Sequence, residues 1–247
     1  MIELLEQPFF LTELSKHFYI NEWMKLQTVS KNFSTSFSLE HSHYTQRHCL
    51  WSQELFEKAC ARQKIHTIVQ ICPLTPNVDP AAKDNDAILC TSVNGHLEVV
   101  KYLVSLKEQF PKINPITSDD DAIQLASFNG HLEVVKYLVS LKKEFPNIDP
   151  AADNNWAIKL ASRNGHLEVV KYLVSLKKDF PNIDPAAYNN DAIRGASYNG
   201  HLEVVKYLVS LKKEFPNIDP AANNNIAIQW ASKSGHLDVV KYLKSLN

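Results

Sequence analysis

The chain has 247 residues, with 26 Lys and Arg against 27 Asp and Glu, so its formal net charge is -1. This balance excludes a general polyanion binder, because nucleic acids and anionic membranes attract proteins with excess positive charge. Apolar residues make up 45% of the chain, as in folded globular proteins. The longest apolar runs, such as residues 9–11, are far shorter than the roughly 20 residues of a membrane-spanning helix. We therefore expect a soluble, intracellular, cytoplasmic monomer without a nucleic-acid or membrane partner.

The first 45 residues do not repeat, and their apolar residues follow two helical patterns separated by Asn21, a candidate N-cap. The positions are Leu11, Leu14, Phe18, Trp23, Leu26, Val29 and Phe33. Their spacing, together with the sequence V-S-K-N-F at residues 29–33, resembles the F-box family. The family's opening Leu-Pro-x-Glu is absent, since Glu6, Gln7 and Phe9 occupy those places.

This resemblance implies that residues 1–45 are an F-box-like helical module. Such a module recruits the small adaptor subunit of a cullin-type ubiquitin ligase. The alternative is a small helical module that only caps the repeats that follow it.

Residues 46–80 are predicted to be a degenerate first copy of a unit that repeats through the rest of the chain. Residues 59–71 match the helix pair of that unit, with Gln63 in place of a glycine, and residues 77–80 match its connector. We expect this copy to cap the array, because a terminal repeat has only one neighbour.

A cluster of metal-ligating residue types lies in this part of the chain: His41, His43, His48 and Cys49. Its spacing fits no zinc module, so we interpret it as a solvated linker rather than a metal site. The four cysteines include no close pair, and we expect them to be reduced packing residues rather than disulfides. They are Cys49, Cys60, Cys72 and Cys90.

Five of the six glycines recur at a spacing of 35 residues. They are Gly95, Gly130, Gly165, Gly200 and Gly235. Each is followed by H-L-E-V-V-K-Y-L-V-S-L or, in the last copy, by H-L-D-V-V-K-Y-L-K-S-L. A period in this range is typical of a solenoid, in which each unit buries its apolar face against the next.

The text after each glycine predicts a helix. In the third copy the apolar residues of 167–174 recur with helical spacing, while Glu168 and Lys171 form an exposed pair. The helix should end near Asp179, because the next residue precedes a proline and avoids the helical region.

A shorter helix is predicted before each glycine, over residues 156–164 in the third copy. Gly165 should close it with a positive φ and turn the chain into the longer helix. The units are joined by the sequence F-P-N-I-D-P, as at residues 145–150, whose prolines exclude a helix and an ordinary central strand. The predicted fold class is all-α.

Each unit resembles the ankyrin repeat in its two helices, its glycine turn and its sequence motif A-x-x-N-G-H-L-E-V-V-K-Y-L. This resemblance implies an ankyrin-repeat helical solenoid. The units are residues 81–115, 116–150, 151–185, 186–220 and 221–247. The family's T-P-L-H opening is absent, and the units repeat every 35 residues rather than the usual number of about 33. Such variants resemble ankyrin proteins of large DNA viruses that infect amoebae, which implies a location in the host cell cytoplasm.

One histidine per unit follows the glycine: His96, His131, His166, His201 and His236. Stacked helices lie roughly 8–10 Å apart, whereas zinc holds its ligands at about 2 Å. These histidines therefore cannot share one ion, and we expect a structural role at the helix turn. The chain contains no phosphate-loop, zinc-protease or nucleophile-elbow motif. We expect no catalytic residue, no metal and no cofactor, so the chain should not be an enzyme.

The first helices differ between units at three positions, which lie nine, six and two residues before the glycine. These offsets form one stripe of a helix, and a stripe that mixes Asp, Lys, Arg and Trp should face solvent. In ankyrin proteins this face lines the concave groove. The resemblance implies that the partner-binding residues are Asp121, Gln124, Phe128, Trp156, Lys159, Arg163, Asp191, Arg194, Tyr198, Gln229 and Lys233, with Tyr188 at a loop tip. Gly195 and Trp230, five residues before their glycines, are interpreted as packing variations.

The aromatic and arginine residues of the stripe concentrate on the third and fourth units, and Trp, Tyr and Arg often dominate protein interfaces. We therefore expect a non-enzymatic protein that binds a protein partner through the groove. With an F-box-like module it would be a substrate adaptor of a cullin-type ubiquitin ligase. The alternatives are a plain interaction scaffold or masking protein, and a stripe that is merely unconstrained surface.

Overall fold

The computed structural model describes residues 53, 56–63, 78–116 and 121–246, and every regular element among them is helical. The all-α prediction is confirmed for this part of the chain. The structure divides into two compact units, Met1–Pro80 and Ala81–Asn247, which we describe separately. No helix among the described residues is both long and apolar enough to cross a membrane.

In the first unit, residues 56–61 are helical and Phe56, Ala59 and Cys60 are buried. Gln63, which stands where later units have glycine, has a φ of 55°. The predicted F-box-like module at residues 1–45 lies outside the described residues, and so does the cluster His41, His43, His48 and Cys49.

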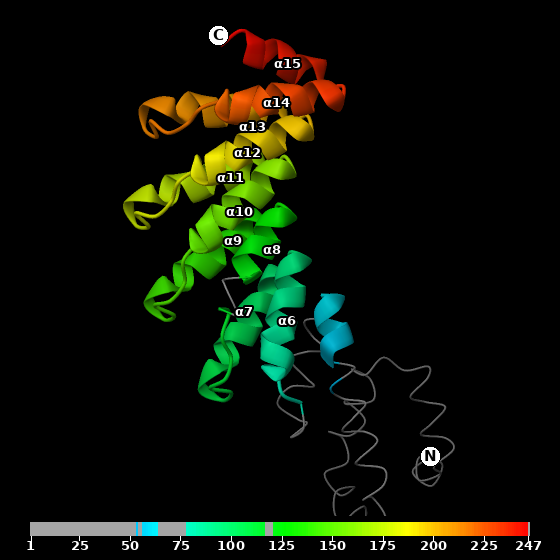
Figure 1. Cartoon of the computed structure of the whole chain (residues 1–247). Coiled ribbons are helices and arrows are strands. Elements are labelled where there is room, and N and C mark those ends of the chain that lie inside the picture. The colour runs from blue at the N-terminus through cyan, green and yellow to red at the C-terminus, as the bar shows by residue number, and fades with distance from the viewer. Residues whose placement is uncertain (1–52, 54–55, 64–77, 117–120, 247) are drawn as a thin grey trace, which may run out of the picture. The chain divides into compact units, whose positions relative to one another are not determined.

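The described part of the second unit contains five helix pairs (Figure 1). The first helices of the pairs are α6 (Ala82–Val93), α8 (Asp121–Phe128), α10 (Ala152–Arg163), α12 (Ala187–Tyr198) and α14 (Ala222–Lys233). The second helices are α7 (Leu97–Ser105), α9 (Leu132–Ser140), α11 (Leu167–Ser175), α13 (Leu202–Ser210) and α15 (Leu237–Lys244). First helices pack on first helices in one row, and second helices on second helices in another.

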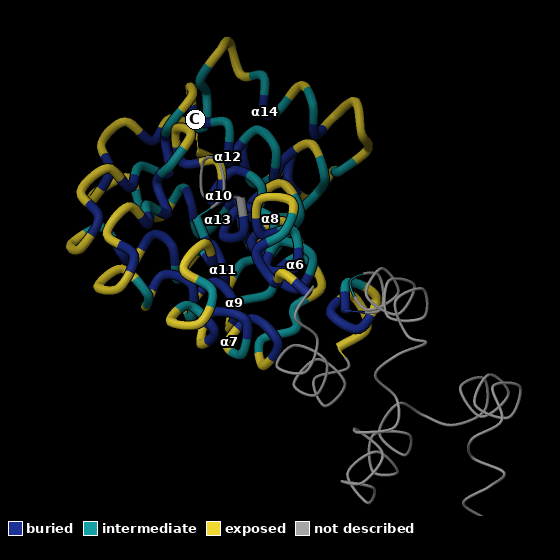
Figure 2. Tube along the Cα trace, turned by 90° about the horizontal axis from the view of Figure 1, so that it is seen from below, coloured by how far each residue is buried: buried dark blue, intermediate teal, exposed yellow. Residues whose placement is uncertain are grey.

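The second helices bury the face that the repeated text predicts. In α11, Val169, Val170, Leu173 and Val174 are buried. On its outer side Lys171 Nζ lies 2.8 Å from Glu168 Oε1, as predicted for the exposed pair. Buried residues follow the interior of the stack, and exposed residues lie along its loops and on the outer faces of its helices (Figure 2).

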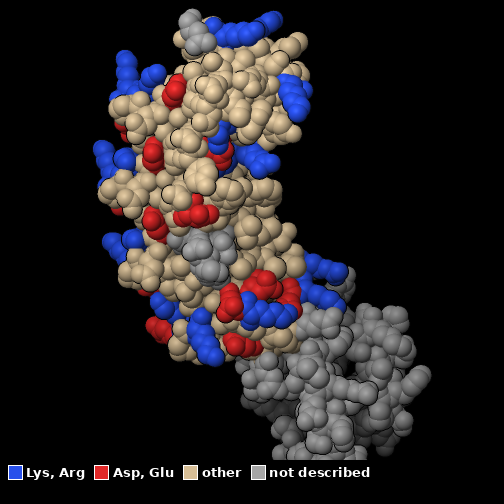
Figure 3. Space-filling model, in the orientation of Figure 1, with Lys and Arg blue, Asp and Glu red and all other residues tan. Residues whose placement is uncertain are grey.

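Each of the second helices α7, α9, α11 and α13 ends in a short 3₁₀ segment: η1 (Leu106–Glu108), η3 (Leu141–Lys143), η4 (Leu176–Lys178) and η5 (Leu211–Lys213). Asp179 follows η4 as its C-cap, which confirms the predicted helix end. The connector then runs back along the stack with its isoleucine inserted into the core, and Ile148 and Ile183 are both buried. Lysines gather on the edge where the second helices end (Figure 3). They lie close to the negative ends of the helix dipoles.

The predicted glycine turn is confirmed, since Gly165 has a φ of 79°. The ring of His201, from the next unit, lies against this turn and fills the space that a side chain at Gly165 would need. The same histidine position bonds the backbone of the preceding unit, because His131 Nε2 lies 2.9 Å from the carbonyl oxygen of Val93. The structural role expected for the histidines is confirmed at these contacts.

One element was not predicted: a left-handed turn that opens α6, α10, α12 and α14. In α10 its residues are Asp153, Asn154 and Asn155, with φ values of 48°, 54° and 62°. Left-handed φ angles cost roughly 1–2 kcal/mol for an ordinary residue, and Asn and Asp tolerate them better than most. The consecutive polar residues of this segment are typical of a loop, so the helical pattern alone could not reveal the turn.

The third residue of the turn joins its unit to the next at Asn85, Asn155 and Asn190 among the described residues. Asn155 is buried, and its Nδ2 donates to the carbonyl of Asn182 at 3.1 Å. Its Oδ1 accepts from the backbone N–H of Asp184 at 2.9 Å. Asn190 makes the same two bonds to the following connector, at 3.2 and 3.0 Å. The favourable hydrogen bonds offset the cost of the left-handed backbone.

Candidate functional site

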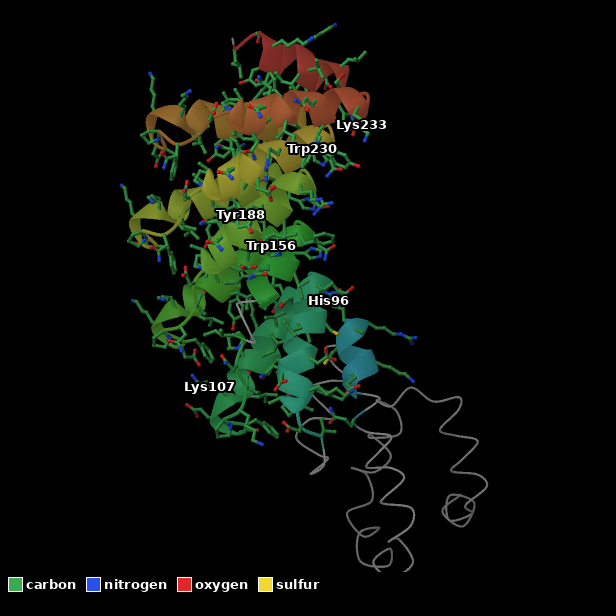
Figure 4. All side chains as sticks on the ribbon, viewed as in Figure 1. His96, Lys107, Trp156, Tyr188, Trp230 and Lys233 are labelled. Atoms are coloured by element: carbon green, nitrogen blue, oxygen red, sulfur yellow. The ribbon has the colours of Figure 1, made fainter. Side chains whose placement is uncertain are left out.

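The variable residues of the first helices come together because α8, α10, α12 and α14 lie side by side. Figure 4 labels Trp156, Tyr188 and Trp230, which come from three successive first helices. Asp121 begins α8, but its side chain lies outside the described residues. At the other end of the row, Gln229 and Lys233 are exposed on α14.

Several of these side chains are exposed, as predicted. Phe128, Trp156, Tyr188 and Tyr198 have 42%, 37%, 66% and 45% of their surface exposed, and Arg163 is also exposed. Large apolar side chains are costly on a surface that has no partner, and a contiguous group of them marks an interaction site. These residues therefore form the strongest candidate for a binding surface in the described part of the chain.

The prediction that the whole stripe faces solvent is wrong for two residues that lie six positions before the glycine, although Gln229 at the same position is exposed. Gln124 is only 8% exposed and Lys159 only 6%. Their side chains are covered because neighbouring first helices lie close on both flanks. Lys159 lies beneath the aromatic rings of Trp156 and Tyr188, and the long stem of a lysine can be buried along apolar surface.

A groove of about 340 Å³ opens along α10, α12 and α14, and we call it the α10–α14 groove. Its lining is Trp156, Lys159, Leu160 and Arg163 from α10, Asp191, Gly195 and Tyr198 from α12, and Trp230 from α14.

Gly195 and Trp230, which we interpreted as packing variations, also belong to this lining. At the corresponding place the second and third units have Leu125 and Leu160. Gly195 contributes only backbone to the groove wall, and Arg163 packs closely against it, since a Cβ at Gly195 would lie 3.3 Å from the Cβ of Arg163. The sequence signal for the groove was that Gly195 in the fourth unit and Trp230 in the fifth replace the leucine of the second and third units.

The aromatic rings of the groove are held in place by their neighbours. The rings of Tyr198 and Trp230 meet edge to face, with their centroids 5.9 Å apart. The guanidinium of Arg194 lies 5.8 Å from the centroid of the Trp230 ring. Rigid aromatic side chains lose little conformational entropy when a partner binds, which favours their use as anchors.

The charges of the groove are unevenly paired. Arg194 Nη2 lies 2.5 Å from Asp191 Oδ1, so the carboxylate of Asp191 is already engaged. The ammonium of Lys159 lies 4.4 Å from the centroid of the Trp156 ring and 4.7 Å from that of Tyr188. No hydrogen-bond acceptor lies within bonding distance of Lys159 Nζ among the residues that the structure describes. Burial lowers the pKa of Lys159, and the nearby carboxylates of Asp191 and Asp153 partly oppose that shift.

Comparison with known proteins identifies one family. The sequence model described as "Ankyrin repeats (3 copies)" matches residues 56–150, 87–184 and 158–247. Together these overlapping matches extend over residues 56–247, well over half of the chain. A search of the curated proteins finds no match.

Proposed function

Because the chain belongs to the ankyrin-repeat family, whose repeats generally mediate protein–protein interaction, we propose that it is a non-enzymatic protein-binding protein. Its partner is a protein held in the α10–α14 groove. The proposal applies to the face of the first helices and not to the edge where the second helices end.

The observation that carries this proposal is the clustering of exposed aromatic side chains with arginine on adjacent first helices. Trp156 and Tyr198 are exposed beside Arg163 and Trp230 in one groove. Residues of these types contribute most of the binding free energy in many protein interfaces, especially where they lie together near the centre. On the second helices the repeated sequence places pairs of Glu and Lys, which are typical of a solvent-exposed helix face.

The test is affinity capture with the full chain, followed by mass spectrometry and affinity measurement on the proteins recovered. The triple variant Trp156→Ala, Arg163→Ala and Tyr198→Ala should lose the partner. Each single change at a central anchor should cost about 2 kcal/mol or more, roughly a thirtyfold loss of affinity. The control is Glu168→Ala with Lys171→Ala on α11, which should retain the partner. A partner retained by the triple variant would lie on another face.

A finer proposal concerns residues 1–45, whose spacing resembles an F-box. With that module the chain would be a substrate adaptor that presents the captured protein to a cullin-type ubiquitin ligase. The supporting residues are Leu11, Leu14, Phe18, Trp23, Leu26, Val29 and Phe33, which all lie outside the described residues.

Binding of the purified small adaptor subunit of the ligase tests this finer proposal. Wild-type chain should bind the subunit, and Leu14→Glu or Trp23→Glu should abolish that binding while the repeats still melt at the wild-type temperature. If the wild-type chain does not bind the subunit at micromolar concentration, the plain scaffold or masking protein is the better description.

A further inference from the structure

The α10–α14 groove contains a largely covered lysine, Lys159, whose ammonium makes no hydrogen bond with the described residues. The ammonium of Lys159 has three N–H donors, and the side chain is only 6% exposed. Aromatic rings lie over it, but a ring face cannot replace the directional bonds that water would make. The ammonium nitrogen is not fully enclosed and opens on the groove, where a ligand acceptor can take the place of water. A ligand carboxylate would supply the missing acceptor.

The lining of the groove carries two cations, Lys159 and Arg163, and one carboxylate, Asp191, which favours an anionic ligand group. On α10, Arg163 lies one turn further along the same groove and is exposed. On α12, Arg194 already engages the carboxylate of Asp191. The lining therefore offers an incoming carboxylate two cations, Lys159 and Arg163, from the same helix.

A space for an apolar side chain lies beside these cations. Gly195 has no side chain, and Leu160, Tyr198 and Trp230 also line the groove. The same position carries Cys90, Leu125, Leu160 and Trp230 in the other four of these units, so the fourth unit alone among the five has no side chain here. Burial of an apolar side chain on these rings is favourable at about 25 cal/mol per Å² of surface removed from water.

We infer that the groove selects a peptide segment that carries an acidic side chain next to a large apolar side chain. The acidic group accepts hydrogen bonds from Lys159 and Arg163, and the apolar group occupies the space over Gly195. This inference rests on the proposed function, since it names the chemistry of the partner for the same groove.

A peptide fits these observations better than a nucleic acid. Single-stranded nucleic acids are bound by grooves in which successive cations follow the phosphates. The α10–α14 groove has two such cations close together, and the whole chain has a net charge of -1. Two neighbouring cations can bind one carboxylate, but they cannot follow a series of phosphates along a nucleic-acid strand.

The experiment is selection of a phage-displayed library of random linear peptides on the full-length chain. The selected peptides should share Asp or Glu within a residue or two of Leu, Ile, Met or Phe. One selected peptide is then synthesised with a fluorophore, together with its amide derivative, in which Asn or Gln replaces the acid. Anisotropy measures the affinities of both peptides.

Two chain variants define the contacts. Lys159→Met keeps an unbranched side chain and removes the charge. It should lower the affinity for the acidic peptide by about tenfold or more. It should leave the weaker affinity of the amide derivative nearly unchanged, which is the signature of direct coupling between the two groups. Gly195→Leu should fill the part of the groove beside Gly195 and lower the affinity for both the acidic peptide and its amide derivative. Lys171→Met on α11 is the matched control and should change neither affinity.

The outcomes separate this inference from the proposed function. If the selected peptides lack an acid, or if Lys159→Met weakens acid and amide peptides equally, the inference is overturned. The proposed function stands in that case as long as Trp156→Ala still weakens binding. Binding that is insensitive to Trp156→Ala and Tyr198→Ala would overturn both. Tighter binding of a fluorescent oligo(dT), lost in Lys159→Met, would also overturn the inference and assign the groove to single-stranded nucleic acid.

Discussion

The imidazole of His201 occupies the space that a side chain at Gly165 would need. A Cβ at Gly165 would lie 2.5 Å from His201 Nδ1, and the backbone there has a φ of 79°. Gly235 has the same φ, but a Cβ at that position would meet nothing within 4 Å among the described residues. The two glycines therefore separate the cost of the backbone angle from the cost of the contact.

Replacement of these glycines by alanine should give unequal losses of stability. Gly235→Ala should cost about 1 kcal/mol, because only the left-handed angle is strained. Gly165→Ala should cost roughly 1–3 kcal/mol more, since the histidine ring must also move. Chemical denaturation of both variants measures the difference. Equal losses would mean that the histidine contact has no energetic role.

The buried asparagine of the left-handed turn should be essential for the junction between units. Asn155→Ala leaves the N–H of Asp184 and the carbonyl of Asn182 without their partner, which should cost about 1–3 kcal/mol. Asn225 has nearly the same backbone angles but is exposed. Asn225→Ala is therefore the matched control for the left-handed strain. A loss at Asn155 no larger than at Asn225 would contradict the proposed junction.

Stability should fall as the pH drops below about 6.5, the ordinary pKa of histidine. Burial lowers the pKa of His201, the carbonyl of Arg163 opposes that shift, and the charges of His166 and His236 add to it. The unfolded chain therefore binds the proton more readily than the folded chain. The neutral ring contributes full stability above the unfolded pKa, and this contribution is lost as the pH falls toward the lower folded pKa.

Denaturation between about pH 7.5 and pH 5.5 measures this dependence, since most carboxylates stay ionised in that window. His201→Gln should be less stable at all pH values, but its stability should depend less steeply on pH. A wild-type chain that becomes more stable in this acid range would show that the sign of the shift is wrong.

Lys159→Met should stabilise the fold while it impairs binding. The pKa of Lys159 is lowered, so its charged form is disfavoured in the folded chain, and the penalty applies at neutral pH. Replacement of a buried charge by an apolar side chain of similar shape is often neutral or stabilising, here by on the order of 1 kcal/mol. Thermal melting checks the gain. A clear loss of stability would show that the contacts of the ammonium with the two aromatic rings outweigh the cost of burying its charge.

The helix pairs were predictable because their signals are local. The apolar residues of Leu167–Ser175 and the glycine that precedes them repeat in every unit, and a helical period can be found within a single copy. The exposure of Trp156, Arg163 and Tyr198 was also predicted correctly, since those positions vary in chemistry between units.

The burial of Lys159 could not be predicted in this way, because it depends on Tyr188 in the next unit. The groove likewise depends on Gly195 and Trp230 jointly, and neither residue is unusual within its own copy. The left-handed turn was missed for another reason. Its residues have no apolar period, and the hydrogen bonds that stabilise it reach a connector 27 to 29 residues further along the chain.

The junctions between units have a consequence for how such a chain can change in length. Asn155 and Asn190 bond equivalent atoms of successive connectors, and the rings of His166 and His201 rest on equivalent glycines. Because these partners recur at one constant offset, duplication or deletion of a whole unit leaves a matching surface on both sides of the new junction. A gene that encodes such an array can therefore gain or lose units by recombination between its own copies, and the folded state survives each step. The α10–α14 groove is more demanding, since it requires the third, fourth and fifth units in their present order.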